Sequence, residues 1–211
     1  MATPLTGKLT SLGTYVVLLT PNRIRKGGCM SQLVDRMIRA AKLDVNLYEE
    51  VEADKTALPQ ALLVVVIANV AIGFGSALAI LWDGEALTFL WALLWGIIGG
   101  IIGWLIWSLI VYLIGVTLFK GPETESNYGE LLRTVGFSAS PGVIGILSFI
   151  PFLGWIIAFV VQVWMLVAMV IAVRQALDFT TWRAIGTCVV GWLVMMVLIW
   201  GIAAVMGLAF F

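Results

Sequence analysis

The sequence contains no histidine and only two cysteines among its 211 residues. Without histidine, the chain lacks the most common protein ligand of metals and haem and the usual proton carrier near neutral pH. Cys29 lies in a polar segment and Cys188 in an apolar one, and two cysteines are too few for a disulfide framework. We therefore expect no metal site, no cofactor and no structural disulfide.

Charged residues are also scarce, at 11% of the chain, whereas hydrophobic residues make up 62%. A chain of this size cannot bury so much apolar surface in a soluble domain, which indicates an integral membrane protein. Twelve basic residues balance twelve acidic ones, so the net charge is zero and nothing indicates a nucleic-acid partner.

Long apolar runs occupy the sequence after residue 60. A helix needs about 20 residues to cross the hydrocarbon core of a bilayer. We expect an all-α, polytopic membrane protein with an N-terminal extension (1–30), short amphipathic helices in a cytoplasmic head (31–59) and a membrane domain (60–211). Its five transmembrane helices are predicted at about 61–82, 87–119, 135–150, 154–173 and 184–208.

The run 87–119 would form a helix about 50 Å long, which exceeds the bilayer core. We interpret it as one tilted or protruding helix. The alternative, a hairpin split at Gly99-Gly100, would place Lys120 and Arg133 on the acidic, outer side. The next long run carries Pro151 and Gly154, which are typical of a turn, and is interpreted as a tight hairpin of two spans.

All twelve Lys and Arg residues lie outside the predicted spans and only in alternate connections: eight in the head, two in 120–133 and two in 174–183. Because basic residues concentrate on the cytoplasmic side, the N-terminus is predicted in the cytoplasm and the C-terminus outside. The apolar stretch 15–19 is too short for a signal peptide, so we expect the head to stay attached.

The head is expected to contain two helices. Ser31 could cap the first, whose apolar positions Leu33, Val34, Met37, Ile38 and Ala41 recur at three- and four-residue spacing. Arg36, Arg39 and Lys42 would then reach phosphate head groups from a helix on the inner leaflet. A helix packed on the cytoplasmic ends of the spans is the other interpretation, and the two are compatible. Asp44 could cap the second helix, whose acidic residues are interpreted as a solvated face: Glu49, Glu50, Glu52 and Asp54.

Two segments carry a family resemblance. The stretches 41–55 and 60–65 resemble the entry to the first span in prokaryotic members of the Yip family. Its pattern Gly-aromatic-Ser-x-x-Pro at the start of the third span is matched by Gly136, Phe137, Ser138 and Pro141. The resemblance covers about residues 38–205.

The resemblance implies a five-helix membrane domain with a cytosolic N-terminus, and eukaryotic relatives that bind Rab-type GTPases in vesicle traffic. The head lacks the Asp-Leu-Tyr-Gly-Pro motif of the eukaryotic type, which puts GTPase binding in doubt. It also points to a bacterial member in the cytoplasmic (inner) membrane, for which the family offers no established activity.

No ionisable residue falls within the five predicted spans, which argues against a carboxylate relay for ions or protons. Asn69 and Gln162 are expected to hydrogen-bond across helices, or to contact a ligand or lipid. Small residues at four-residue spacing predict close helix packing, either within one chain or between chains: Gly75, Gly96, Gly99, Gly100 and Gly103.

The sequence offers no nucleophile, base or metal cluster in an apolar cleft, so we predict that the chain is not an enzyme. The favoured function is a membrane scaffold that binds lipids and other membrane proteins, with Arg23, Arg25 and Lys26 of the extension as candidate docking residues. One alternative is an accessory subunit of a respiratory or photosynthetic complex. Another is a lipid or small-molecule transporter, for which 136–145 is the candidate break in a span.

Overall fold

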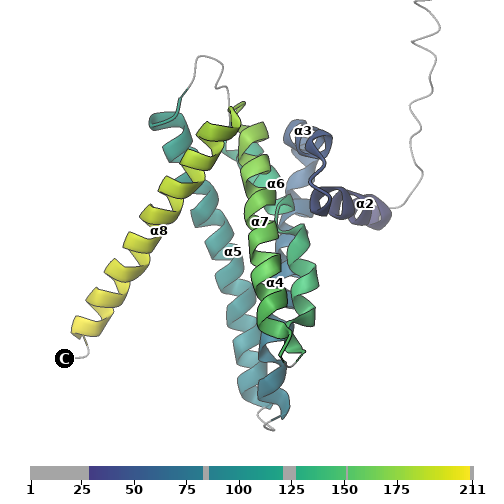
Figure 1. Ribbon diagram of the computed structural model, residues 1–211, viewed down its shortest axis with the longest axis vertical. Coiled ribbons are helices and arrows are strands. Elements are labelled where there is room, and N and C mark those ends of the chain that lie inside the picture. The colour runs from purple at the N-terminus through teal and green to yellow at the C-terminus, as the bar shows by residue number, and fades with distance from the viewer. Residues whose placement is uncertain (1–28, 83–85, 121–126, 151, 210–211) are drawn as a thin grey trace, which may run out of the picture. The chain divides into compact units, whose positions relative to one another are not determined.

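The computed structural model describes residues 29–82, 86–120, 127–150 and 152–209, and every regular element among them is a helix (Figure 1). Backbone contacts divide the chain into two units, residues 1–32 and 33–211. Helix α2 (Cys29–Ala41) begins in the first unit and ends in the second. The other helices all belong to the second unit, which carries the candidate site.

The head contains α2, α3 (Val45–Ala53) and the short 3-10 helix η1 (Lys55–Ala57). Asp44 caps α3 as expected, because its side chain accepts a hydrogen bond from the Asn46 amide at 3.1 Å. Ser31 does not cap α2, since that helix already begins at Cys29. The cap prediction for Ser31 was therefore wrong, because Ser31 lies inside the helix.

Five segments are long and apolar enough to cross a membrane, which confirms the predicted all-α, five-span fold class. They are formed by α4 (Leu58–Trp82), α5 (Ala86–Thr117), α6 (Tyr128–Phe137) together with the 3-10 helix η2 (Ser140–Phe149), α7 (Gly154–Ala176) and α8 (Thr181–Ala209).

Helix α5 runs through Gly99-Gly100 without interruption, as one helix rather than a hairpin. Its 32 residues span about 48 Å, against about 30 Å of bilayer hydrocarbon. One face of the C-terminal part of α5 is buried in protein, because Val111 belongs to a core cluster with Leu131 of α6 and Val173 of α7. The opposite face stays exposed at Leu109 and Leu113.

The third span begins earlier than predicted, at Tyr128 instead of residue 135. Asn127 and Glu130 form a capping box there: Asn127 accepts from the Gly129 amide at 2.9 Å, and Glu130 accepts from the Asn127 amide at 2.8 Å. Arg133, which the sequence placed in a polar loop, thus lies within a candidate span and is buried. The expectation that no span contains an ionisable residue was wrong.

The same span is broken after Phe137 and continues as η2. A 3-10 helix rises about 2.0 Å per residue instead of 1.5 Å, so the ten residues of η2 extend over about 20 Å. This rise lets a segment of 22 residues, part of which is non-helical, keep the length needed to cross a bilayer.

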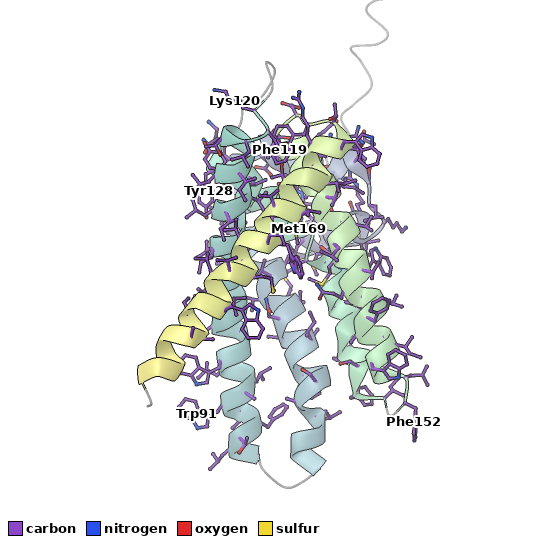
Figure 2. The ribbon with its side chains drawn as sticks, turned by 60° about the vertical axis from the view of Figure 1, so that its left-hand side comes forward. Trp91, Phe119, Lys120, Tyr128, Phe152 and Met169 are labelled. Carbon is purple, nitrogen blue, oxygen red and sulfur yellow. The ribbon has the colours of Figure 1, made fainter. Side chains whose placement is uncertain are left out.

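Two apolar clusters hold the second unit together. The first joins the head to α4, α6 and α7 through residues that include Leu47, Tyr48, Val51, Ala61 and Phe137. The second joins the head-side ends of α5, α6, α7 and α8. Figure 2 shows α8 crossing α5 at an angle and leaving it toward the C-terminus, which leaves Val197 and Trp200 largely exposed.

Candidate functional site

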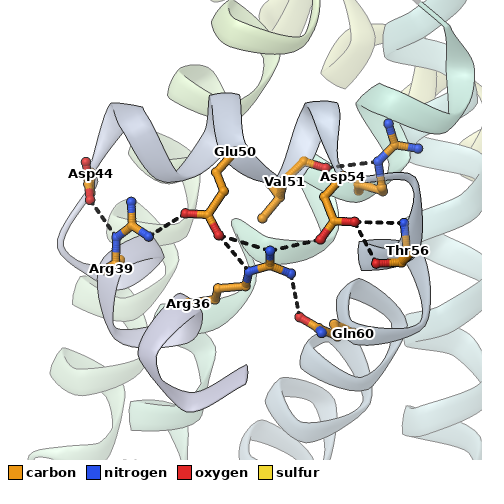
Figure 3. Close-up of polar contacts among 9 residues, drawn as sticks. Arg36, Arg39, Asp44, Glu50, Val51, Asp54, Thr56 and Gln60 are labelled. Atoms are coloured by element: carbon orange, nitrogen blue, oxygen red, sulfur yellow. Dashed lines mark hydrogen bonds and ion pairs between the residues drawn. The ribbon is translucent and has the colours of Figure 1, made fainter. Parts of the chain in front are cut away.

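The most organised polar cluster among the described residues lies where α2, α3 and the start of α4 meet (Figure 3). Arg36 of α2 is its centre and is only 4% exposed. Its Nε donates to Glu50 Oε1 at 3.1 Å, and its Nη2 lies 2.9 Å from Asp54 Oδ2. Its Nη1 donates to Gln60 Oε1 at 2.8 Å. One guanidinium therefore ties α2 to α3 and to the first span.

Arg39 extends this cluster at the surface of the head. Its Nε donates to Asp44 Oδ2 at 2.8 Å and its Nη1 to Glu50 Oε2 at 2.6 Å. The hydrogen bond to Glu50 is the main cause that raises the pKa of Arg39. Burial is the largest single effect on Glu50 and would raise its pKa, but the hydrogen bonds from Arg39 and Arg36 together lower it. Glu50 is held as a carboxylate.

These contacts correct the expected role of two basic residues. Arg36 and Arg39 were predicted to reach phosphate head groups, but carboxylates of the same head neutralise them. Helix α2 packs on the membrane domain through Leu33 and Ala40, which is compatible with a position on the membrane surface. Lys42 is exposed, and its contact with lipid stays a prediction. The candidate docking residues Arg23, Arg25 and Lys26 lie outside the described residues.

Arg133 of α6 makes the second tie between head and membrane domain. Its Nε donates to the Val51 carbonyl at 2.9 Å, and its Nη2 donates to the Glu52 carbonyl. Carbonyls in the last turn of a helix have no partner within the helix, so Arg133 closes the end of α3. These two hydrogen bonds explain how the charged side chain of Arg133 can be buried, with only 7% of it exposed.

Glu52 lies at the same junction with an unusual electrostatic environment. Burial, followed by the negative charges of Asp178 and Glu130, raises the pKa of Glu52 to about 7. The charge of Arg133 opposes this shift and does not cancel it. Glu52 therefore changes its charge near neutral pH, whereas Glu50 and Asp54 have lowered pKa values.

Two predicted packing residues meet between α4 and α5. Asn69 does not bond across helices as expected: its Nδ2 donates to the Val65 carbonyl of its own helix at 2.8 Å. It lies instead directly over Gly100, where a Cβ atom would come within 2.2 Å of Asn69 Cγ. Gly75 is a second close approach, since a Cβ there would lie 2.4 Å from the Gly145 carbonyl oxygen of η2.

The remaining residues that were predicted to pack between helices have either free space beside them or an exposed side chain. Nothing lies within 4 Å of a Cβ built on Gly96, Gly99 or Gly103, so close packing at these glycines stays a prediction. Gln162 is exposed and makes no hydrogen bond within the part of the chain that the structure describes. It borders an apolar groove of about 670 Å³ between α5, α7 and α8, where Trp107 Nε1 donates to Met169 Sδ at 2.9 Å.

The four motif residues form the break between α6 and η2. Gly136 packs on α4, where a Cβ would lie 2.8 Å from Ala61 Cβ. Phe137 is fully buried, and Ser138 Oγ donates to the Val135 carbonyl at 2.7 Å. Pro141 stands in the first turn of η2, where its missing amide is not needed. The motif thus ends one helix and starts another against α4.

The chemistry available at these places is limited. No group of three metal-binding side chains occurs among the described residues. The groove beside the break, about 400 Å³, is lined only by apolar residues of α4 and η2, such as Val70, Phe74 and Val143. Neither groove contains an acid, a base or a nucleophile paired with one. The polar groups of the junction are engaged in holding helices together.

A family model for the Yip1 domain matches residues 46–203, about three quarters of the chain. The chain belongs to the Yip1 domain family. This confirms the suspected resemblance to the Yip family and makes the protein a membrane protein of that family. No curated protein and no solved structure matches the sequence. The Yip1 domain includes Glu50, Asp54 and Arg133, whereas Arg36 and Arg39 precede it.

Two contacts that shape the fold were not predicted from the sequence. Trp104 Nε1 donates to the Leu132 carbonyl at 3.2 Å, and Trp164 Nε1 donates to the Ala41 carbonyl at 2.8 Å. No local pattern indicates such contacts between distant helices. The capping pattern Asn127-x-x-Glu130, by contrast, was a signal that could have placed the start of α6 and hence Arg133.

Proposed function

We propose that this member of the Yip1 domain family is a non-catalytic scaffold in a bacterial cytoplasmic membrane, with its head in the cytoplasm and its C-terminus outside. The Arg36 cluster carries this proposal. The ion pairs and the hydrogen bond of Arg36 hold the head on the first span, and none of them points into a cavity. The head is therefore a fixed platform on the membrane domain. A platform of this kind suits the recruitment of other proteins.

The proposed orientation rests on the exposed basic residues. Lys55, Lys120 and Arg174 are exposed, and each stands at the head-side end of a span. None of the three is neutralised by an ion pair within the described residues. Unpaired basic side chains at one end of the spans favour the cytoplasmic side.

The partner is proposed to be a membrane protein, either in a transient assembly or as part of a respiratory or photosynthetic complex. The test is extraction of the natively expressed full chain in mild detergent, followed by mass spectrometry. We expect a stoichiometric membrane partner that is lost when Arg23, Arg25 and Lys26 are all replaced by alanine. The matched control exchanges arginine and lysine at these positions and should retain the partner. A chain without a partner in every preparation would contradict the proposal.

Transport is a second candidate because the third span is broken between α6 and η2, as spans that line transport sites often are. The groove at this break is apolar, which suits a lipid chain better than an ion. Reconstituted protein that moves fluorescent lipids between leaflets, with loss of movement in Gly142→Leu, would favour transport. Gly142 is chosen because it lies at the break, where a Cβ would touch Ala68, Ile72 and Met165.

A further inference from the structure

Helix α2 has two apolar sides, and only one of them is covered. Leu33 and Ala40 are buried in the cluster that joins the head to the spans. Met30, Val34 and Ile38 are 67%, 50% and 50% exposed, and their spacing of four residues places them in one stripe along the helix. A helix with water on its outer side would carry polar residues at these positions.

The C-terminal end of α2 lies beside a span. Trp164 Nε1, near the middle of α7, donates to the Ala41 carbonyl at 2.8 Å. In Figure 1, residues 33–41 of α2 lie across the direction of α4 and α7. A helix held in this way runs along the membrane plane, not through it.

The contact between Trp164 and Ala41 lies where the lipid-facing surface of α7 ends. On α7, Val160 and Val167 are half exposed and share a helix face with Trp164, at spacings of four and three residues. One turn beyond Val167 on this face, Ile171 packs against the cluster that joins the head to the spans. The apolar surface of α7 that faces hydrocarbon therefore ends beside the end of α2.

The two arginines of α2 do not compete with an apolar contact. Arg36 and Arg39 are paired with carboxylates of the head, so neither is available to a head-group phosphate. The apolar surface of α2 that remains exposed in the second unit is formed by Val34 and Ile38. Amphipathic helices with such a stripe bury it in the boundary between head groups and acyl chains.

We propose that Val34 and Ile38 of α2 insert into the head-side leaflet of the membrane, as an apolar contact with lipid acyl chains. This contact fixes the depth of the head at the bilayer surface. It does not select lipids by charge, because its side chains are uncharged. The proposal holds whether or not the protein is a scaffold, and whichever side of the membrane carries the head.

The test places a nitroxide spin label on the full chain in liposomes, in a background with Cys29 and Cys188 replaced by serine. Labels at Val34→Cys and Ile38→Cys are expected to collide more often with oxygen, which dissolves in acyl chains, than with a water-soluble nickel chelate. Gln32→Cys, an exposed position on the polar side of the same helix, is the control and should show the reverse.

Two results would overturn the proposal. Collision with the chelate at Val34 and Ile38, as at Gln32, would place the stripe in water. Exclusion of both reagents would show that a second copy or another protein covers it. The oxygen preference should also be the same in phosphatidylcholine liposomes with and without phosphatidylglycerol, and its appearance only with the anionic lipid would contradict an apolar contact.

A second measurement avoids substitution altogether. The unlabelled full chain is reconstituted with a lipid that carries a photoreactive diazirine on its acyl chain, and the adducts are located by mass spectrometry. Adducts on Val34 or Ile38 are expected in addition to those on the spans. Adducts confined to the spans would contradict the insertion of α2.

Discussion

Asn69 on α4 fills the space that a side chain on Gly100 of α5 would need. A Cβ atom on Gly100 would lie 2.2 Å from both Cγ and Oδ1 of Asn69, far inside van der Waals contact. The carboxamide is fixed there by its hydrogen bond to the Val65 carbonyl. This pair sets how closely the first two spans approach each other.

Gly100→Ala is expected to destabilise the protein by about 1–3 kcal/mol, the usual cost of overpacking a tight contact. Gly99→Ala is the matched control, because nothing lies within 4 Å of a Cβ at that position. It should be neutral or slightly stabilising, since alanine favours a helix over glycine by about 1 kcal/mol. Thermal unfolding in one detergent compares the two variants.

The same contact predicts a rescue. Asn69→Ala removes the carboxamide that the new methyl group would strike, so the double variant with Gly100→Ala should recover part of the lost melting temperature. Equal melting temperatures for Gly100→Ala and Gly99→Ala would show that α4 and α5 do not approach at Asn69.

Replacing Arg36 by methionine should lower the stability by about 2 kcal/mol, because Glu50 and Asp54 would each lose a charged hydrogen-bond partner. Both carboxylates are partly exposed, which keeps the loss below that of a fully buried pair. Lys42→Met is the control at an exposed position and should change stability by less than about 0.5 kcal/mol. Unfolding monitored by circular dichroism measures the stability of both variants. If Arg36→Met and Lys42→Met lose the same stability, the Arg36 cluster does not hold the head to the spans.

The raised pKa of Glu52 makes stability depend on pH. The pKa is about 7 in the folded chain against a reference value of 4.5, so between these values the folded state holds a proton that the unfolded state has released. The contribution is complete below pH 4.5 and is lost as the pH rises through about 7.

We therefore expect Glu52→Gln to raise the melting temperature at about pH 8, and to weaken the decline that the natural chain shows between about pH 5 and pH 8. Melting temperatures of both proteins across this range measure the difference. If the two curves run parallel, Glu52 does not titrate there.

Sequence patterns predicted the spans because hydropathy and helix length depend on local residues. Helix α5 is one example, since charge placement alone argued against a hairpin at Gly99-Gly100. Arg133 shows the limit: a basic residue near a polar loop resembles a flanking charge, and only the folded chain brings it to the carbonyls of α3, 81 and 82 positions away.

The candidate site was less predictable for the same reason. The helical pattern of α2 places Arg36 among apolar residues but does not reveal Glu50 and Asp54, which approach through a tertiary contact. Asn69 was singled out as a packing residue, but its contact with α5 depends on Gly100 having no side chain. Contacts of this kind follow from helix packing, which a single sequence does not specify.

Trp164→Phe is expected to loosen α2 with little effect on the spans, because it removes one hydrogen bond to the Ala41 carbonyl while keeping the apolar ring. Hydrogen exchange should speed up in residues 33–41 and stay unchanged in α4 and α5. Trp155→Phe, at an exposed position on the same helix, is the control. Unaltered exchange in α2 would show that Trp164 does not hold this helix.

The scaffold proposal is tested most directly by photocrosslinking in intact cells. A photoreactive amino acid at Arg25 in the extension is compared with one at Phe152, which lies 90% exposed in the turn before α7. We expect one discrete crosslink from Arg25 to another membrane protein, and only lipid adducts from Phe152. Lipid adducts or self-crosslinks alone at Arg25 would contradict a scaffold that recruits its partner through the extension.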